Sequence, residues 1–417
     1  MIILINFNSY LGGGETLLVR FARYLYERHI SFHAYCKDDS FIIKQLQVEG
    51  VPNNCVTGIS SNCNYPYLSK KERNDLLDVI EKGLPIEETY EYLTFCLRDL
   101  YLLMDLNKRH QGSICHLILH NQDYRYIGRT ILDGIFEKLT HKRLFNNKKN
   151  LTFNKHIISE VNIHKGLIPM SWIIKELWKR ELGIEIPENM IVSLPAFSEG
   201  SDVHVKTHND KKIIFIGRLV DFKFASLFAM FNFIKRNPSY QLSVVGSGDK
   251  QRALNYMQEH QIPKANIHFL GEIAYSDLPR VIADHSIGYA AGTSIIECAK
   301  QGIPVIMALQ NNENQQFHKD ICGGLFYHTS KGNLGEDLCL YKEKDIKTTI
   351  DHAIEEIEQD YRLAATRCYN FVKNEYSNNG NFEEYLNILR TSMPFDSSNI
   401  VVPCAGLIRR IVFKHAK

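Results

Sequence analysis

The strongest constraint on the fold is a series of short apolar segments in which polar and apolar residues do not alternate. They lie at residues 2–7, 32–36, 114–119, 156–159, 190–193, 212–216, 241–245, 266–270, 286–290 and 304–307. Strands that are buried on both faces have this pattern, and helical stretches of ten or more residues separate many of these segments. The sequence therefore predicts an α/β protein with parallel sheets covered by helices.

Length and a polar break indicate two domains. The chain has 417 residues, too many for one ordinary domain, and 44% of them are hydrophobic, enough for two cores. Residues 195–211 are polar and contain proline and glycine, and a new apolar segment begins at Lys212. We expect an N-terminal domain at 1–195, a C-terminal domain at 208–375 and a terminal helix and tail at 376–417.

Composition excludes several classes of protein. The net charge is +2, so the whole molecule is not a polyanion binder and we expect no nucleic-acid partner. The ten cysteines form no C-x-x-C pair, which leaves a tetrahedral zinc site without support. Cysteines inside apolar segments, such as Cys115, indicate a reduced, cytoplasmic protein. No apolar run approaches the 18 residues that a membrane span needs.

The first glycine-rich turn, Gly12 to Glu15, follows the first apolar segment and opens a helix. The backbone N–H groups of Gly13 and Gly14 are suited to a phosphate at a helix N-terminus. A tight turn without any ligand is the alternative. Leu17 stands where the dinucleotide fingerprint needs glycine, and the chain contains no Gly-Lys pair. These absences argue against a dehydrogenase and a P-loop nucleotidase.

The second turn, Gly217 to Lys223, follows the segment 212–216. Ligands bind beyond the carboxyl ends of strands in open α/β sheets, where Arg218 would lie. Arg218 as a fork and Lys223 as a point charge are able to hold a diphosphate. The alternative is a solvated pair of charges in which Arg218 binds Asp221.

The third turn, Val244 to Asp249, again joins a strand to a helix through glycines. Gly246 and Gly248 would permit a close approach of the backbone to a ligand, and Asp249 suits the first turn of a helix. A purely structural turn explains this segment equally well.

The fourth turn opens a helix after the segment 286–290. The predicted phosphate contacts are the N–H groups of Gly292, Thr293, Ser294 and Ile295, with the carboxylate of Glu297 on ribose hydroxyls. The alternative is a capping box in which Ser294 and Glu297 bind backbone N–H groups.

Two histidines, His116 and His120, share one face of the strand at 114–119. His116 lies mid-strand and is expected in the core, whereas His120 lies at the carboxyl end, where it is placed to meet a ligand. A zinc pair is the alternative, although no third ligand is evident.

The order of these motifs resembles the retaining glycosyltransferases of family four, also called glycosyltransferase group 1, which have the GT-B fold. That fold has two facing Rossmann-like domains with a donor cleft between them and C-terminal helices. The matching segments span nearly the whole of 1–391. They are Gly12–Glu15, Gly217–Lys223, Val245–Gly248, Phe269–Gly271, Asp277–Pro279 and Glu297–Ile306.

The resemblance implies roles for particular residues. His120, Arg218 and Lys223 would be catalytic, with the two cations on the donor diphosphate and the histidine facing the donor sugar. Ile273 would contact the base through its backbone, and Glu297 would bind the ribose. No metal or other cofactor is implied, and the chain contains no D-x-D motif. The donor-binding set is Gly13, Gly14, Gly217, Gly246, Ile273, Tyr289, Gly292, Thr293, Ser294, Ile295 and Glu297.

Two positions depart from the family pattern. Tyr289 stands where the family has a glutamate near the donor sugar, and Phe224 replaces the glycine that usually follows the lysine. Tyrosine is neutral near pH 7 and its ring stacks on sugar faces. We therefore expect Tyr289 to influence which donor sugar is used.

The function expected from the resemblance is transfer of a sugar from a nucleotide-sugar, UDP-linked by family habit, to a glycan or lipid-linked acceptor in bacterial surface polysaccharide synthesis. A catalytically silent GT-B subunit that scaffolds a partner enzyme is one alternative, and a nucleotide-sugar epimerase is another. The basic, amphipathic tail at 405–417 predicts peripheral contact with the inner face of the membrane, or else packing on the N-terminal domain.

Overall fold

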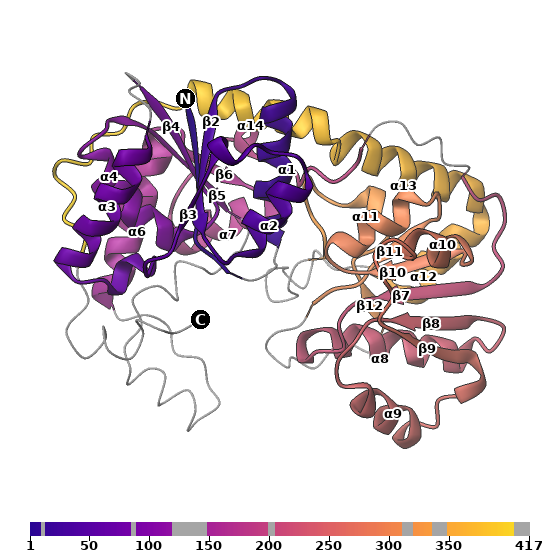
Figure 1. Cartoon of the computed structure of the whole chain (residues 1–417). Helices are drawn as coiled ribbons and strands as arrows, with labels where there is room; N and C mark the ends of the chain where they lie inside the picture. The colour runs from indigo at the N-terminus through magenta and orange to yellow at the C-terminus, as the bar shows by residue number, and fades with distance from the viewer. Residues whose placement is uncertain are drawn as a thin grey trace. The chain divides into compact units, whose positions relative to one another are not determined.

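The computed structural model of the chain describes residues 1–9, 13–84, 89–118, 148–198, 205–310, 320–335 and 348–403. The chain forms two compact units, each built on its own sheet (Figure 1). The N-terminal unit contains Met1–Met170, Ile174–Val192 and Phe382–Lys417, and the C-terminal unit contains Ser171–Ile173 and Ser193–Asn381. The predicted α/β class is confirmed.

The N-terminal unit has a parallel sheet with the strand order β3-β2-β1-β4-β5-β6. Its strands are β1 (Ile2–Asn6), β2 (Phe32–Lys37), β3 (Val56–Ile59), β4 (Tyr90–Thr94), β5 (Gly112–Ile118) and β6 (Leu167–Pro169). Strand β1 is buried along its whole length, as expected for a central strand covered on both faces. The chain order reverses beside β1, so the topological switch point lies between β1 and β4.

Helices pack on this sheet through apolar faces. They are α1 (Gly13–Glu27), α2 (Phe41–Val48), α3 (Lys70–Gly83), α4 (Leu97–Asn107), α6 (Lys148–Ile163), α7 (Trp172–Leu182) and α14 (Asn378–Thr391). Helix α14 comes from the far end of the chain and stacks Phe382 on Phe21 of α1, with ring centroids 5.3 Å apart. The buried guanidinium of Arg73 donates to the carbonyls of Val402 and Pro403, and so holds the segment after α14 to this unit.

The C-terminal unit has a parallel sheet with the strand order β11-β10-β7-β8-β9. Its strands are β7 (Lys212–Ile216), β8 (Gln241–Val245), β9 (Ile267–Gly271), β10 (Ile287–Ala290) and β11 (Val305–Met307), and an antiparallel pair joins β12 (Ile321–Cys322) to β13 (Thr348–Thr349). Its helices are α8 (Asp221–Arg236), α9 (Lys250–Glu259), α10 (Leu278–Ala283), α11 (Thr293–Lys300), α12 (Ile350–Gln359) and α13 (Tyr361–Glu375). The switch point here lies between β7 and β10.

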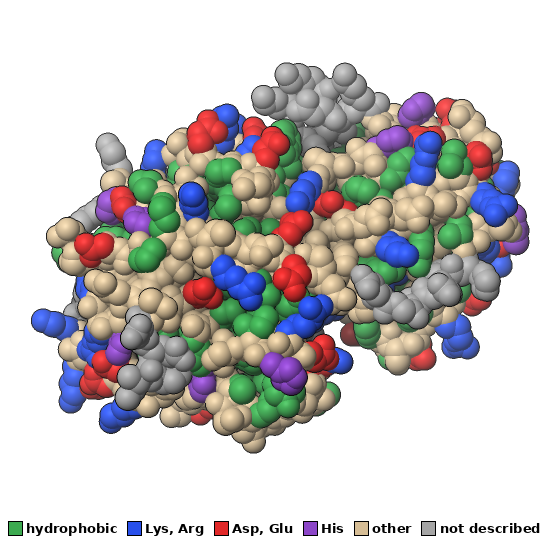
Figure 2. Space-filling view, turned by 90° about the horizontal axis from the view of Figure 1, so that it is seen from above, with side chains coloured by type: hydrophobic (Ala, Val, Ile, Leu, Met, Phe, Trp, Pro, Cys, Tyr) green, Lys and Arg blue, Asp and Glu red, His purple; other side chains and the backbone are tan. Residues whose placement is uncertain are grey.

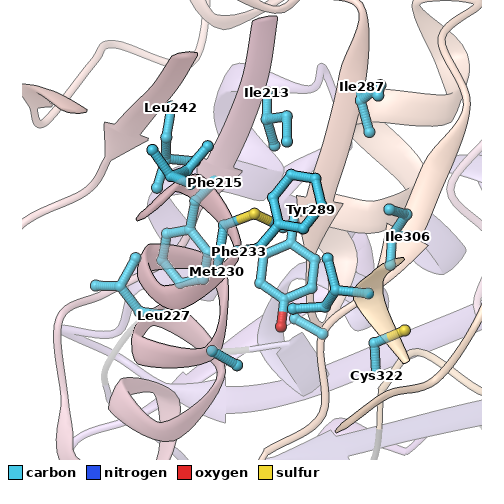
Figure 3. Close-up of a cluster of buried hydrophobic side chains, with 14 of the residues drawn as sticks. Ile213, Phe215, Leu227, Met230, Phe233, Leu242, Ile287, Tyr289, Ile306 and Cys322 are labelled. Atoms are coloured by element: carbon cyan, nitrogen blue, oxygen red, sulfur yellow. The ribbon is translucent and has the colours of Figure 1, made fainter. Parts of the chain in front are cut away.

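A large aromatic and aliphatic core lies between this sheet and helix α8. Phe215 from β7, Leu242 from β8 and Phe233 from α8 are all buried in it (Figure 3). Burial of large aromatic side chains contributes strongly to the stability of such a core.

The face of the molecule in Figure 2 carries basic and acidic side chains interspersed, which agrees with the small net charge.

Two of the predicted strands are wrong. Residues 156–159 lie inside helix α6, where Ile157, Ile158 and Val161 are buried at helical spacing. Residues 190–193 are buried but lie outside every described strand: Met190 ends a short 3-10 helix, Glu188–Met190, and the N–H of Val192 donates to the carbonyl of Pro169. A short apolar run does not by itself distinguish a strand from a buried helix turn or an extended segment.

Backbone hydrogen bonds join the loop after β7 to the loop after β8. The N–H of Leu219 donates to the carbonyl of Ser247 over 2.8 Å, and the N–H of Asp249 donates to the carbonyl of Leu219 over 2.9 Å. Gly248 permits this approach because its φ is +131° and a Cβ there would lie 2.3 Å from the carbonyl oxygen of Leu219. The position of the first loop therefore depends on the absence of a side chain in the second.

We predict that Gly248→Ala lowers the free energy of unfolding by about 3 kcal/mol, because backbone strain of about 1–3 kcal/mol is joined by a clash with main-chain atoms. Gly271→Ala is the matched control, since Gly271 also has positive φ, +73°, but nothing lies within 4 Å of its Cβ position. Its cost should be only about 1–2 kcal/mol. Urea denaturation of both variants measures the difference, and equal losses would contradict the clash.

Candidate functional site

The loops at the switch point of the C-terminal unit form the candidate site. Strands β7 and β10 are parallel neighbours, so the loops that follow them emerge at the same edge of the sheet. Ligands of open α/β sheets bind at this kind of position. We call residues 217–223, 246–249 and 291–297 the switch-point edge.

Arg218 and Lys223 are two cations at this edge without an acidic partner among the described residues. Arg218 is exposed and Lys223 is half-buried. The amino group of Lys223 lies 3.0 Å from where a Cβ on Gly217 would be, so it is held against the loop backbone. Burial, together with the charge of Arg218, lowers the pKa of Lys223 to about 8. Such a pair favours an anion, which would relieve the repulsion between the two charges.

The alternative pairing of Arg218 with Asp221 is wrong. The carboxylate of Asp221 binds the guanidinium of Arg252 instead. The same guanidinium lies over the ring of Phe224, 4.5 Å from its centroid. Phe224 is itself buried in the core, so a phenylalanine in place of the family's glycine packs under this edge and does not face a ligand.

Helix α11 opens at Gly292, whose φ of 72° and ψ of −153° suit glycine. The N–H of Gly292 donates to the carbonyl of Leu334 over 2.6 Å, and the N–H of Ile295 donates to the carbonyl of Gly292. These two of the four predicted donors are therefore already satisfied. Within the described residues the N–H groups of Thr293 and Ser294 have no acceptor, so they are the two available to an anion.

Glu297 does not form the capping box that was the alternative for this helix. The N-cap is Gly292, and no side chain caps the helix. The carboxylate of Glu297 accepts instead from the hydroxyl of Tyr275 at 3.0 Å and from the amino group of Lys300 at 3.2 Å. The sequence did not predict a role for Tyr275, whose only signal is its place in the loop after the F-L-G motif.

The loop after β9 lies beside the switch-point edge. The carbonyl of Gly271 accepts from the N–H of Gly246 at 2.8 Å, which ties the start of this loop to the loop after β8. Ile273 follows two residues later and is half-buried. Its main chain is thus placed near the other predicted donor-binding residues of this unit.

Tyr289 is placed differently from the expectation. Its side chain is fully buried among core residues of β7 and α8, with its ring centroid 6.2 Å from that of Phe215 (Figure 3). Its hydroxyl donates to the carbonyl of Ser226 over 3.2 Å, and burial raises its pKa. The side chains of a strand alternate between faces, and that of Tyr289 points toward α8. The structure therefore assigns Tyr289 a packing role in place of the expected contact with a donor sugar.

The remaining predicted residues belong to the N-terminal unit. Gly13 and Gly14 open helix α1 after β1, while Gly12 and His120 lie outside the described residues. His116 is buried, as predicted, and burial lowers its pKa to about 4.

Acidic groups lie at the switch point of the N-terminal unit. The buried carboxylate of Glu15 accepts from the side-chain amide of Asn8 at 2.6 Å, and Arg98 donates to the carbonyl oxygen of the same amide at 2.8 Å. Asp99 is also buried, and burial raises its pKa to about 6 against the opposing charge of Arg98. This end of the sheet therefore carries a polar network in which two buried carboxylates share one guanidinium.

Comparison with known proteins agrees with this geometry. Residues 197–347 match the family model of glycosyl transferases group 1. No curated protein matches the chain. Among solved structures, Anabaena Alr3699/HepE in complex with UDP has a TM-score of 0.59 at 13% identity, covering 94% of this chain and 99% of that one.

Two further solved structures are similar over the same extent. The pneumococcal O-GlcNAc transferase GtfA in complex with UDP and GlcNAc has a TM-score of 0.56 at 12% identity, covering 93% of this chain and 98% of that one. The sucrose-phosphate synthase of Thermosynechococcus elongatus has a TM-score of 0.58 at 12% identity, with the same coverage.

The two parallel α/β units match these structures over almost the whole chain, so the chain has the GT-B fold. Residues 197–347, the segment that carries Arg218, Lys223 and Glu297, match the family model of glycosyl transferases group 1, so the resemblance predicted from the motifs is confirmed over this segment. No helix in the described ranges is long and apolar enough to cross a membrane.

We predict that Tyr289→Ala lowers the free energy of unfolding by about 3–5 kcal/mol, the range for emptying an aromatic core position. Tyr289→Phe should cost only about 1–2 kcal/mol, because it removes one buried hydrogen bond and leaves the ring in place. Chemical denaturation measures both. A Tyr289→Phe variant that keeps its stability but loses nucleotide affinity would show that the hydroxyl meets a ligand.

Proposed function

We propose that the protein moves a sugar, with retention of configuration, from a nucleotide-sugar to a glycan or lipid-linked acceptor in bacterial surface polysaccharide synthesis. The observation that carries the proposal lies at one edge of the sheet, where Arg218 and Lys223 have no acidic partner among the described residues and two N–H groups of α11 are open. A UDP-linked donor is favoured because HepE was solved with UDP and with UDP-glucose.

In the proposed reaction the bond from the sugar to the diphosphate breaks and negative charge grows on the departing diphosphate. Arg218 binds its oxygens as a fork, and Lys223 becomes fully charged as the anion approaches. The N–H groups of Thr293 and Ser294 add two fixed dipoles at the positive end of α11. These groups stabilise the charge where it develops, so we propose that transfer requires no metal ion.

The resemblance assigns the residues that bind the other parts of the donor. Glu297 binds the ribose, Ile273 contacts the base through its main chain, and Gly217 and Gly246 keep the loops that surround the diphosphate close together. In the N-terminal unit, the resemblance assigns His120 to the donor sugar and Gly13 and Gly14 to donor binding. The tail at 405–417 lies outside the described residues, and we propose that it contacts the inner face of the membrane.

One observation favours a second candidate, a catalytically silent subunit that scaffolds a partner enzyme. Where the family carries a glutamate near the donor sugar, this chain has Tyr289 buried in the core. The position thus supplies no carboxylate to sugar hydroxyls. Release of UDP from UDP-glucose and other UDP-sugars by the purified protein separates the two candidates, because the silent subunit would release none.

We predict that Arg218→Ala and Lys223→Ala each lower the transfer rate by about 10²–10³, the usual loss when one charge-stabilising contact is removed. The melting temperature should change little, because neither side chain has an acidic partner in the described structure. Lys235→Ala is the matched control, since Lys235 lies on the same helix as Lys223 but its amino group binds the carbonyl of His260. Near-wild-type turnover in both test variants would remove the donor-site assignment.

The pKa of Lys223 predicts a pH dependence of donor binding. In the free protein Lys223 loses its charge as the pH rises through about 8, whereas a bound diphosphate holds the proton on. UDP affinity should therefore be constant below about pH 7.5 and fall above pH 8 by up to about tenfold per unit. Calorimetric titration between pH 7 and 9 measures this fall. In Lys223→Arg the affinity should stay level, because arginine keeps its charge.

A further inference from the structure

The side chain of Tyr275 is exposed, but it makes a specific contact with Glu297, the residue that is predicted to bind the ribose. Its side chain is 64% exposed, yet its hydroxyl donates to Oε1 of Glu297 over 3.0 Å. Exposed tyrosines gain little from holding one position, because side-chain ordering opposes the bond. The relevant question is therefore which other groups the carboxylate of Glu297 binds.

The other contacts of Glu297 limit how many donors it can still accept. Lys300 donates to Oε1 at 3.3 Å and to Oε2 at 3.2 Å, and also reaches the carbonyl of Ala196 at 3.4 Å. Each carboxylate oxygen accepts about two hydrogen bonds. Counting donors from the described residues, with Tyr275 in place Oε1 already accepts two hydrogen bonds and Oε2 accepts one, which leaves one position.

A ribose presents two neighbouring hydroxyls and is bound best when each meets a different oxygen of the carboxylate. That arrangement requires one open position on Oε1 and one on Oε2. Removing the hydroxyl of Tyr275 from Oε1 creates this condition, because Lys300 then takes one position on each oxygen.

The loop that carries Tyr275 is fixed at both ends. The carbonyl of Gly271 is bound by the N–H of Gly246, and the N–H groups of Asp277 and Leu278 both donate to the carbonyl of Ala274. The backbone beside Tyr275 is thus already ordered. Rotation of the exposed side chain alone is sufficient to move its hydroxyl away from Glu297.

We propose that Tyr275 is a specificity-determining residue that occupies the ribose position on Glu297 and must be displaced when the donor binds. This inference rests on the proposed function, since it assumes that Glu297 binds a ribose. The proposal implies that the site binds the nucleotide more weakly than it would without the hydroxyl of Tyr275. It also implies that a nucleotide whose ribose lacks the two hydroxyls does not displace Tyr275.

The test measures UDP affinity of the full chain by calorimetry in the wild type and in Tyr275→Phe. The variant keeps the ring and removes only the competing hydroxyl, so it should bind UDP about threefold to tenfold more tightly, the range of one net hydrogen bond. With 2′,3′-dideoxy-UDP, which lacks both ribose hydroxyls, wild type and variant should bind equally.

Tyr327→Phe is the matched control. Tyr327 donates to Glu356 over 2.8 Å in the same unit, and it belongs to no predicted binding residue set. Removing the hydroxyl of Tyr327 should leave the affinity for UDP unchanged. Equal or weaker UDP binding by Tyr275→Phe would overturn the inference while leaving the proposed function standing, and so would an equal gain for UDP and the dideoxy analogue. If neither wild type nor Tyr275→Phe binds UDP, the proposed function fails and the inference with it.

Discussion

The candidate site depends on the backbone hydrogen bonds that join the loops after β7, β8 and β9. Leu219 and Asp249 close the first pair of loops, and Gly246 and Gly271 close the second. Because main-chain groups hold these loops together, the side chains of the loops are not needed to support their conformation. Arg218 and Lys223 are thus left with their charges available, and burial, together with the charge of Arg218, lowers the pKa of Lys223.

The two units differ in the charge found at their switch points. The C-terminal unit places two cations there, whereas the N-terminal unit places the buried carboxylates of Glu15 and Asp99 in a network with Arg98. Negative charge near the N-terminal site opposes a further anion, since buried groups interact through a weakly screening medium. The charges therefore favour the C-terminal unit for the proposed diphosphate, and neutral hydroxyl-rich groups are better matched to the N-terminal unit.

Much of the fold was predictable because the pattern of apolar residues along the sequence indicates which segments are buried. Eight of the ten apolar segments correspond to strands β1, β2, β5, β7, β8, β9, β10 and β11. The failures have a common cause, since one-dimensional patterns do not give side-chain direction. The motif order located Tyr289 but did not show that its ring faces α8, and spacing suggested a capping box with Glu297 although the N-cap is Gly292, which has no side chain to cap the helix. Tyr275 was missed because its contact joins segments 22 residues apart.

The glycine contacts between the loops also bear on how such a protein diverges. A junction made of main-chain atoms survives almost any change elsewhere in the sequence, provided that the glycines remain. Selection can then replace the outward side chains one at a time, and new donor preferences arise on an architecture that does not have to be rebuilt.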